Sequence, residues 1–532
     1  MPTQTMAGIG EPLGPVLRFQ PYFPARLVRF SDNHPTSSTN YILDPIGGSP
    51  QLLADLVKAG HRVIATVSNP VDRLLLQYTL SSPPPEVVRS VMAELSQLRI
   101  EGVRLEKHLQ AMMSTTCGKC GQQVPVDRYI WNDDTKTLIE KVFNCPCGYG
   151  GEFGVDEKDL ALADKWARSD GLYRSAILSL FKPIDGVDSN DLVEYLKIYS
   201  PRSLHGIDLL VNRIREGFDS DEKNACARLL VLFVADRCSG MWNPAESMYR
   251  PKMVQCPPKR IETNIWNALT DAYIALLEPR DKGVVYQYPD LPEGAGLVLY
   301  PGSYKKWLAT NPKLPIMDVI TVLPRPSQAY WILSAIWARW ILDTDEKEEY
   351  LAILRRKRFD WAWYGEVLGT LMARIIKNCP SNAPLTLFIP DAESDFLLVV
   401  AYALARAGFH WFSFTPRSGS ELTMVEVNRE KTASSHQIGS TKLVKDWLQD
   451  ILLDSFSTGS EPKTYFLILA DVLQVIGTTS PQFLTEYSAD QLEKDLQLVL
   501  EGPLFEDIAN RLSVKTGIWK RKGSESQASL GF

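Results

Sequence analysis

Apolar residues near the start of the chain recur with two alternating periods, one typical of strands and one typical of helices. The run Tyr41-Ile42-Leu43 predicts a short buried strand, which leads into the turn Asp44-Pro45-Ile46-Gly47-Gly48-Ser49-Pro50. Residues 52–57 repeat apolar side chains at helical spacing, and Gly60 ends this helix. The β-branched segment 62–67 predicts a second strand. The order of these elements predicts one strand–helix–strand unit.

The same alternation returns in the second half of the chain. Strand patterns cover 284–286, 296–300, 318–323, 385–389, 409–414 and 422–427, and helical patterns cover 330–341, 361–377 and 396–406. The interval between the two halves has a different pattern: 71–112 predicts two helices broken by the prolines at 83–85, and 156–275 is mostly helical. Because strands alternate with helices on both sides of this interval, we expect an α/β fold with a doubly wound, Rossmann-like sheet.

Four of the eight cysteines form two closely spaced pairs. Cys117 and Cys120 are separated by two residues, Cys145 and Cys147 by one, and 24 residues lie between the pairs. Two such pairs on short hairpins can place four thiolates around one Zn²⁺, as in a zinc ribbon. The alternative is a set of reduced, buried cysteines, because the second pair is one residue shorter than usual. Four thiolate ligands leave no open coordination position, so we expect a structural zinc rather than a hydrolytic one.

These patterns divide the chain into five predicted segments. The sheet domain begins in 1–112 and resumes in 281–431, and a zinc ribbon at 113–155 and a helical insertion at 156–280 interrupt it. The last segment, 432–532, predicts a small helical appendage with helical patterns at 443–453 and 466–476. We expect the serine-rich tail after Lys522 to be disordered.

Composition and charge exclude several classes of protein. The 532 residues are 45% hydrophobic and 23% charged, which is ordinary for a globular chain. The formal net charge of -6 at pH 7 argues against a globally basic coat for nucleic acid, so any such contact must use a local patch. We expect no membrane segment, because no apolar stretch approaches the roughly 20 residues that a spanning helix needs. The absence of a secretory pattern and the small number of cysteines favour the cytoplasm.

Neither the histidines nor the first turn indicates a catalytic site without further information. The six histidines are scattered without metal-binding spacing, so neither a catalytic metal nor a histidine-based triad is predicted. Gly47 and Gly48 would let a ligand approach the backbone closely at a helix N-terminus. They equally suit a tight turn between core elements that binds no ligand, and the segment alone leaves both interpretations open.

Several segments, taken in order, resemble the zinc-ribbon-containing amino-group DNA methyltransferases. They are Asp44-Pro45-Ile46-Gly47-Gly48-Ser49, Asn69-Pro70, the ribbon cysteines, Tyr199-Ser200-Pro201-Arg202, Arg250-Pro251, Glu262-Thr263-Asn264-Ile265-Trp266 and Asp318-Val319-Ile320-Thr321. The resemblance covers about residues 20–430. It implies a class I S-adenosylmethionine fold and methylation of the exocyclic amine of adenine or cytosine. The cofactor contacts that it implies are made by Asp44, Pro45, Gly47, Gly48, Ser68 and Asn69.

Three departures from the family's pattern predict that the chemistry is lost. Pro50 stands where the first motif of the family ends in glycine, and a proline has no N–H and cannot adopt a positive φ. Val67-Ser68 replaces the acidic residue that accepts hydrogen bonds from the ribose of the cofactor. The family's Asp-Pro-Pro-Tyr tetrad is replaced by Val322, Leu323, Pro324 and Arg325, which lack the acceptor for the target amine and the aromatic platform for the flipped base. Misalignment is the alternative, but no other sequence in the chain completes such a tetrad.

We therefore expect a DNA methyltransferase-like protein that has lost S-adenosylmethionine-dependent catalysis and acts by binding nucleic acid or a partner protein. The candidate phosphate contacts are Arg355-Arg356-Lys357-Arg358 and Lys305-Lys306, with ordinary solvated faces as the alternative. The acidic total charge favours a protein partner over DNA alone. Two other functions stay open: an active amino-group DNA methyltransferase with divergent motifs, which still binds S-adenosylmethionine, and a zinc-ribbon interaction scaffold.

Overall fold

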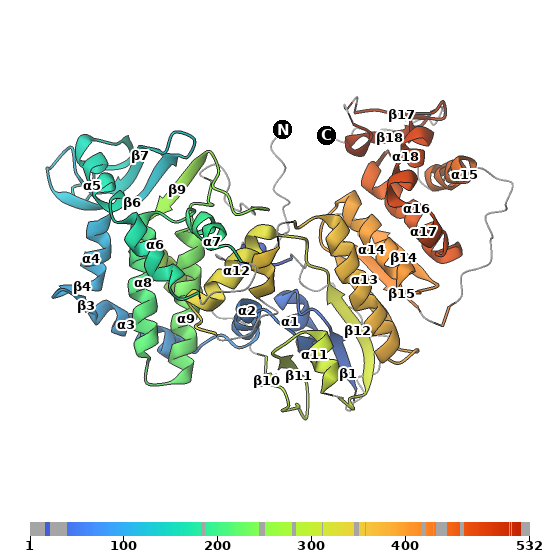
Figure 1. Ribbon diagram of the computed structural model, residues 1–532, viewed down its shortest axis with the longest axis horizontal. Helices are drawn as coiled ribbons and strands as arrows, with labels where there is room; N and C mark the ends of the chain where they lie inside the picture. Colours follow the sequence, from blue (N-terminus) through green and yellow to red (C-terminus); the bar gives the residue numbers. More distant parts are fainter. Residues whose placement is uncertain are drawn as a thin grey trace. The chain divides into compact units, whose positions relative to one another are not determined.

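The chain forms two compact units, each built from three separate stretches of sequence (Figure 1). The computed structural model describes residues 16–21, 40–181, 187–243, 251–278, 283–310, 312–344, 351–356, 358–416, 422–428, 430–431, 444–457, 462–509, 511 and 513–522. The first unit comprises Met1–Gln20, Val67–Val285 and Ser327–Lys357, and the second comprises Pro21–Thr66, Tyr286–Pro326 and Arg358–Phe532. Consecutive elements of the sequence therefore often belong to different units.

An eight-stranded sheet forms the centre of the second unit. Its strands, in spatial order, are β10 (Val285–Gln287), β11 (Gly296–Tyr300), β2 (Arg62–Thr66), β1 (Tyr41–Asp44), β12 (Ile316–Val322), β13 (Leu385–Ile389), β15 (Thr423–Val427) and β14 (Phe412–Pro416). The pairings from β11 to β13 are parallel, whereas β15 is antiparallel to both of its neighbours. The predicted strands at these positions are confirmed, and the fold is mixed α/β with a largely parallel sheet.

The central strands are apolar along almost their whole length because both faces of the sheet are covered. All five residues of β13 and all four of β1 are buried, and near-continuous apolar runs of this kind are typical of parallel strands. The helices of this unit are α1 (Pro50–Lys58), α11 (Tyr304–Ala309), α13 (Trp361–Asn378), α14 (Ser394–Arg406), α15 (Val444–Ser457), α16 (Tyr465–Thr479), α17 (Phe483–Glu486) and α18 (Ala489–Leu500). Gly408, with φ +91°, follows the end of α14, where a positive φ favours glycine.

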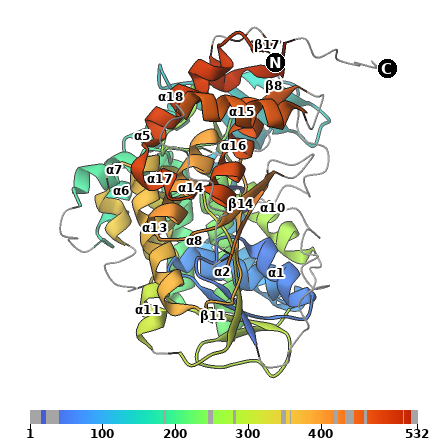
Figure 2. The same cartoon turned by 90° about the vertical axis from the view of Figure 1, so that its right-hand side faces the viewer.

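The C-terminal helices pack against the edge of the sheet, as Figure 2 shows for α16 and β14. A Cβ at Gly477 of α16 would lie only 2.3 Å from the carbonyl oxygen of Phe412, so glycine is required there. The side-chain oxygen of Gln474 accepts hydrogen bonds from the Phe414 N–H at 2.6 Å and the Ser413 hydroxyl at 2.9 Å. α16 thereby covers an edge strand that would otherwise expose unpaired backbone groups.

The segment predicted as a helical appendage is more complex than its sequence pattern indicated. Its two predicted helices correspond to α15 and α16, but the prediction missed α17, α18 and a three-stranded sheet. That sheet consists of β16 (Lys463–Thr464), β18 (Ile518–Arg521) and β17 (Phe505–Asp507). Strands of two to four residues are too short to show an alternating pattern. The first residues of the predicted appendage, 432–443, and the tail after Lys522 lie outside the described residues.

Helices dominate the first unit. They are α2 (Pro70–Leu80), α3 (Pro85–Gln97), α4 (Leu105–Met112), α5 (Glu157–Ala167), α6 (Asp170–Leu178), α7 (Ser189–Leu196), α8 (Pro201–Glu216), α9 (Asp221–Arg237), α10 (Ile265–Leu277) and α12 (Gln328–Trp340). Every residue of 229–236 in α9 is buried, as expected of a helix that is surrounded by others. Across the described part of the chain, no helix combines the length and the apolar character needed to cross a membrane.

The predicted pair of helices at 71–112 is wrong in one respect, because the structure has three helices and a hairpin there. The hairpin joins β3 (Arg99–Ile100) to β4 (Val103–Arg104). Its two turn residues, Glu101 and Gly102, have φ values of +49° and +82°. Two consecutive positive φ values are typical of the tight turns that match the twist of a β-hairpin.

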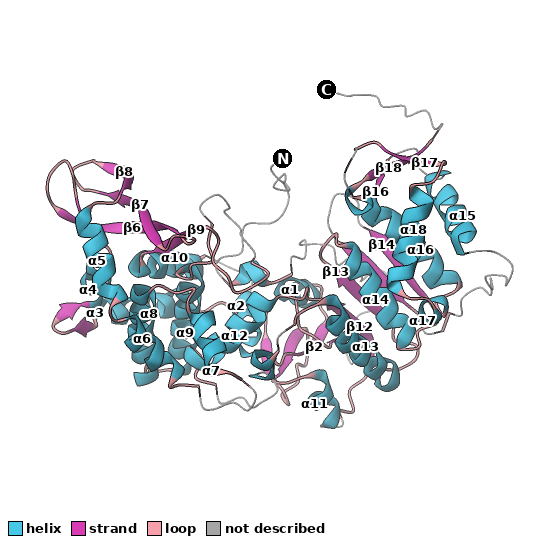
Figure 3. Cartoon of the chain, turned by 45° about the horizontal axis from the view of Figure 1, so that its top comes forward, coloured by secondary structure: helices cyan, strands magenta, loops and turns pink. Residues whose placement is uncertain are grey.

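The ribbon of the first unit is a five-stranded sheet, coloured magenta in Figure 3. Four strands come from the predicted ribbon: β5 (Ser114–Thr116), β6 (Gln123–Asn132), β7 (Thr137–Asn144) and β8 (Gly150–Gly154). The fifth, β9 (Lys259–Thr263), lies within the segment predicted as a helical insertion and pairs antiparallel with β6. The ribbon is therefore completed by a strand that lies more than a hundred residues beyond it in sequence.

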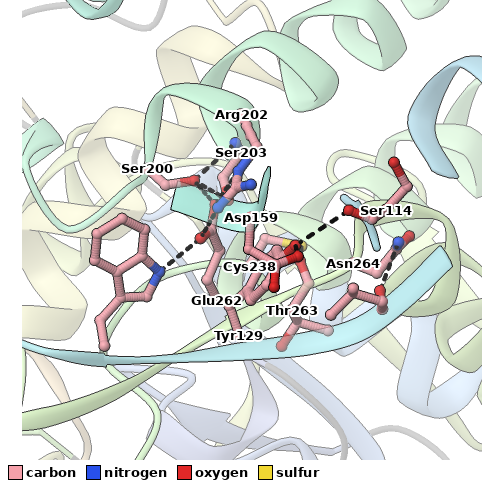
Figure 4. A network of polar contacts seen from close by, with 12 residues as sticks. Ser114, Tyr129, Asp159, Ser200, Arg202, Ser203, Cys238, Glu262, Thr263 and Asn264 are labelled. Carbon is pink, nitrogen blue, oxygen red and sulfur yellow. Dashed lines mark hydrogen bonds and ion pairs between the residues drawn. The ribbon is translucent and has the colours of Figure 1, made fainter. Parts of the chain in front are cut away.

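A buried ion pair holds the ribbon against the helices (Figure 4). Arg202 at the start of α8 donates from Nε and Nη2 to the two carboxylate oxygens of Glu262 on β9, at 2.9 and 2.6 Å. Trp131 of β6 donates to the same carboxylate at 2.7 Å, and Ser200 also donates to it. The Arg202 guanidinium lies 4.8 Å from the ring centroid of Tyr129. Two of the segments that carry the family resemblance thus meet at this pair.

Asn264 joins the same strand to the next helix. Its side chain accepts the N–H of Trp266 at the start of α10 and donates to the carbonyl of Val126 on β6 at 2.9 Å. The Asn264 N–H donates to the carbonyl of Asp127 at 3.0 Å. One residue therefore caps α10 and fixes it to the ribbon.

We expect Glu262→Gln to destabilise the folded protein by about 3–5 kcal/mol, because removing one partner leaves the Arg202 charge buried and unpaired. Burial alone would raise the pKa of Glu262, but Arg202 and Ser200 hold it below its usual range. The contribution of the ionised Glu262 to the free energy of unfolding is therefore complete at neutral pH. It is lost only when the pH falls through that lowered pKa. Chemical denaturation at pH 7 measures the change.

Glu194→Gln is the matched control for this variant. Glu194 pairs with Lys197 three residues later, and both side chains are more than half exposed. Exposed pairs contribute less than about 1 kcal/mol. Equal losses in the two variants would contradict the anchoring role of Glu262.

Candidate functional sites

The four ribbon cysteines converge on one point. Their Sγ atoms all lie within 4.8 Å of one another. Cys117 and Cys147 are 3.7 Å apart and Cys120 and Cys145 are 3.5 Å apart between Sγ atoms. Tetrahedral coordination with Zn–S bonds of about 2.3 Å separates sulfurs by about 3.8 Å, whereas a disulfide brings them to about 2.05 Å. The spacing fits a metal ion such as zinc, and none of these cysteines forms a disulfide.

The two cysteine turns reach the same geometry with different lengths. The Cys117 N–H donates to the carbonyl of Gln122, five residues later, and the Cys145 N–H donates to the carbonyl of Tyr149, four residues later. Each turn contains a glycine with positive φ, Gly121 at +74° and Gly148 at +81°. The second turn is one residue shorter, which is why one residue rather than two separates its cysteines.

A bound cation would allow all four cysteines of the cluster to ionise. Burial opposes ionisation of Cys117, but the backbone N–H groups of Cys120 and Lys119 and the adjacent thiols lower its pKa to about 6. The N–H of Cys147 also favours the thiolate of Cys145, yet burial and the neighbouring thiols raise the pKa of Cys145 to about 12. Four thiolates therefore coexist only when a bound cation offsets their repulsion.

Asp44 occupies the second predicted site, at the carboxyl end of β1. It is fully buried, and its Oδ1 accepts hydrogen bonds from the N–H groups of Ile46 (3.0 Å) and Gly47 (2.7 Å) and from the Thr321 hydroxyl on β12 (2.7 Å). Its Oδ2 has no hydrogen-bond partner within the described residues. Burial raises the pKa of Asp44 to about 6 despite these hydrogen bonds. Asp44 thus stabilises the turn that follows it and joins β1 to β12.

The other groups of this turn are also engaged by the protein itself. The Thr66 hydroxyl donates to the carbonyl of Pro45 at 2.8 Å. Ser49 caps α1 through its hydroxyl, and Pro50 is the first helical residue, a position that suits proline. Gly47 has φ +63°, which glycine adopts without strain. Each of these observations fits the interpretation of a tight turn that binds no ligand.

The turn after β1 lies directly against the end of β12. A Cβ at Gly48 would lie 2.9 Å from the carbonyl oxygen of Val322 and 3.7 Å from the ring of Pro324. Val322 and Leu323 are fully buried, and the Leu323 N–H donates to the carbonyl of Phe388 on β13 at 2.9 Å. The structure therefore brings the first motif and the tetrad positions together. Gly48 packs directly against Val322 and Pro324.

The remaining tetrad residue faces a carboxylate. Arg325 donates to Glu393, which precedes α14, and both side chains are about 30% exposed (28% and 33%). A guanidinium paired in this way joins the loops after β12 and β13. It is not available to lie on a base without breaking the pair.

Ser68 and Asn69 belong to the first unit rather than to the unit that holds Asp44. Ser68 is exposed, and Arg73 donates to its carbonyl. Asn69 accepts the Val71 N–H at 3.0 Å and caps α2. Asn69 thus has a structural role that its position before Pro70 explains.

The predicted basic residues are mostly at the surface. Arg355, Arg358, Lys305 and Lys306 are exposed, and Arg356 is half-buried. Lys357 and Arg250, which belonged to the predicted patch and to one motif, lie outside the described residues. Arg355 and Arg356 belong to the first unit, whereas Arg358 belongs to the second.

Sequence analysis missed a second buried acid, on the strand next to that of Asp44. Asp318 lies on β12, opposite Ile42 of β1, and is 3% exposed. Burial raises its pKa to about 7, although the Val319 N–H favours the ionised form. Its Oδ1 has no hydrogen-bond partner among the described residues. An aspartate within an otherwise apolar strand was the available signal, because strands covered on both faces rarely contain a charge.

Comparison of the chain with models of protein families, with curated proteins and with solved structures found no significant match to any of them.

We expect the purified protein to contain close to one zinc ion per chain, because only a cation allows the four thiolates to coexist. Metal analysis by mass spectrometry measures the content. Cys117→Ser should lower it to near zero, and Cys256→Ser, which changes a partly buried cysteine outside the cluster, should not. Absence of metal in the wild type, or bound iron, would remove the zinc assignment.

We expect Asp44→Asn to stabilise the protein above about pH 6 and to have little effect below about pH 3.5. The folded pKa of about 6 lies above the ordinary value of 3.8, so the unfolded state ionises first and the wild-type fold loses stability as the pH rises from about 4 to about 6. Two pKa units correspond to about 3 kcal/mol, an upper limit because the new amide group would be buried without an acceptor. Denaturation across this pH range tests the difference.

The exposed Asp446→Asn is the control, with an expected change within about 0.5 kcal/mol at either pH. A difference for Asp44→Asn that does not vary between about pH 3.5 and about pH 7 would contradict the raised pKa.

Proposed function

We propose that this protein is a non-catalytic relative of the zinc-ribbon DNA methyltransferases and works by binding nucleic acid or a partner protein. The observation that carries the proposal is the packing at the end of β12. There Val322, buried and apolar, replaces the family's hydrogen-bond acceptor, and its carbonyl oxygen lies against Gly48. A site without an acceptor cannot stabilise the developing charge on a target amine.

The order of the strands supports the methyltransferase-like part of the proposal. From β11 through β2 to β1 the chain order runs one way across the sheet, and from β12 to β13 it runs the other way. In doubly wound sheets this reversal marks the crevice in which ligands bind, outside the carboxyl ends of the strands. Here the crevice would fall between β1 and β12, where Asp44 and Gly48 contact the protein's own chain.

The closed cysteine cluster supports a structural role for zinc. Four sulfurs offer no open position for water or substrate, so the ion would stabilise the ribbon and perform no chemistry. Reduced cysteines also suit the cytoplasm, which stays our proposal for the location.

The exposed basic residues support binding of nucleic acid, but the acidic total charge limits its strength. Arg355, Arg358, Lys305 and Lys306 are exposed and can contact phosphates. With 57 basic against 63 acidic residues, the whole protein nevertheless repels a polyanion at long range. A protein partner is therefore the alternative ligand.

The first test is calorimetric titration of S-adenosylmethionine into the zinc-loaded protein. We expect no saturable heat up to millimolar cofactor, because the polar groups of the turn after β1 already bond within the protein. Micromolar binding would instead favour the active methyltransferase, and methyl transfer to DNA would then be measured directly.

The second test is binding to a labelled DNA duplex, followed by fluorescence anisotropy at several salt concentrations. We expect the double variants Arg355→Ala/Arg358→Ala and Lys305→Ala/Lys306→Ala to bind more weakly and to reduce the salt slope by about one for each lost phosphate contact. Lys165→Ala/Arg168→Ala removes the same charge from two exposed residues at the C-terminal end of α5 and is the control. Equal effects in all three variants, or no DNA binding at low salt, would direct the search to a protein partner.

A further inference from the structure

A cavity of about 380 Å³ opens in the first unit, and none of the functions considered above uses it. The last turn of α8 and one face of α9 form two of its walls, and the residues that follow α12 form the third. Small-molecule sites in proteins have volumes from about 300 Å³ upward. The cavity is therefore large enough for a compact metabolite.

Three kinds of side chain line this cavity. Ile214 and Ile341 are 4% and 2% exposed and provide an apolar floor. Arg228 is half-buried and brings a guanidinium to the wall formed by α9. Asp221 and Asp343 are exposed and bring two carboxylates to the rim. Apolar, cationic and anionic groups thus surround one space.

Arg228 is a cation of this lining that no carboxylate of the protein pairs with in the described structure. Its Nε is buried and has no hydrogen-bond partner, and the side chain forms no ion pair within the described residues. Because the side chain is only half-buried, the rest of its guanidinium can bind an anionic group in the cavity. The carboxylates of the lining leave it available, since neither Asp221 nor Asp343 pairs with Arg228 in the described structure.

A second arginine stands at the mouth of the cavity. Arg215 is exposed, and its Nη2 donates to the carbonyl of Trp340 at 3.1 Å, which fixes the guanidinium near the end of α12. With Arg228 it balances the charge of Asp221 and Asp343, so two cations and two anions line the space. A lining of zero net charge does not attract a polyanion such as nucleic acid. It suits a ligand that carries both charges.

We propose that this cavity binds a small zwitterion of the α-amino-acid class. Arg228 donates hydrogen bonds to the carboxylate of the ligand, for which the planar guanidinium is well matched. Asp221 and Asp343 bind the ammonium group at the rim, and the aliphatic or aromatic side chain lies on Ile214 and Ile341. The proposal does not depend on the methyltransferase-like function, because all of these residues belong to the first unit.

Calorimetric titration of the zinc-loaded, full-length protein with leucine and phenylalanine tests the proposal. Two analogues separate the charges: 4-methylpentanoate is leucine without its ammonium group, and 3-methylbutylamine is leucine without its carboxylate. We expect saturable binding of at least one amino acid, and a loss of at least about tenfold in affinity for each leucine analogue if leucine is the ligand bound. No heat with either amino acid overturns the proposal, as does tighter binding of inorganic phosphate, which would indicate a simple oxyanion site.

Two variants assign the contacts. Arg228→Met keeps the length of the side chain and removes the guanidinium, and Asp343→Asn keeps a residue that tolerates the φ of +49° at this position. Each should weaken binding at least about tenfold, whereas Arg168→Met at the exposed residue that follows α5 should not change it. Should Arg228→Met fail to fold, as judged by circular dichroism, Asp343→Asn decides. Unchanged affinity in Asp343→Asn overturns the proposed recognition of the ammonium group.

Discussion

A carboxylate and a guanidinium withdrawn from water are tolerated only when each finds partners, and this requirement organises the first unit around Arg202 and Glu262. The pair joins the start of α8 to β9, and Trp131 brings β6 to the same carboxylate. The start of α8 and two strands of the ribbon, β6 and β9, therefore meet at one buried ion pair. Asn264 extends the constraint to α10, two residues beyond Glu262. Neighbouring polar side chains in one short segment thus position three elements.

In the second unit the same principle applies to a single acid. Asp44 is buried at the end of β1. One of its carboxylate oxygens accepts hydrogen bonds from two N–H groups of the following turn and from the Thr321 hydroxyl. The turn must then pass so close to β12 that only glycine fits at position 48. Residues that in a methyltransferase would face a cofactor here stabilise the contact between two strands. This is the physical basis for proposing that the sheet supports binding and not methyl transfer.

The ribbon shows how different backbone lengths yield one metal geometry. Hydrogen bonds from the cysteine N–H groups close a longer turn at Cys117 and a shorter one at Cys145, and a glycine with positive φ completes each turn. The sulfurs consequently reach separations that a tetrahedral ion would impose. A charge cluster of this kind couples metal binding to folding, because the thiolates repel one another without a cation.

The amino-acid sequence by itself determined the strands of the sheet, the main helices and the four cysteines, because hydrophobic period and ligand spacing are properties of neighbouring residues. Only the tertiary structure decided the rest. Three of the five residues of β9 are charged, so it lacks the apolar run that marked the other strands, and its place beside β6 depends on contacts between distant residues. The partner of Arg202, the burial of Asp318 and the contact of Gly48 with Val322 likewise arise from packing. No local pattern encodes which side chain faces which across the fold, so these interactions could not be predicted from sequence.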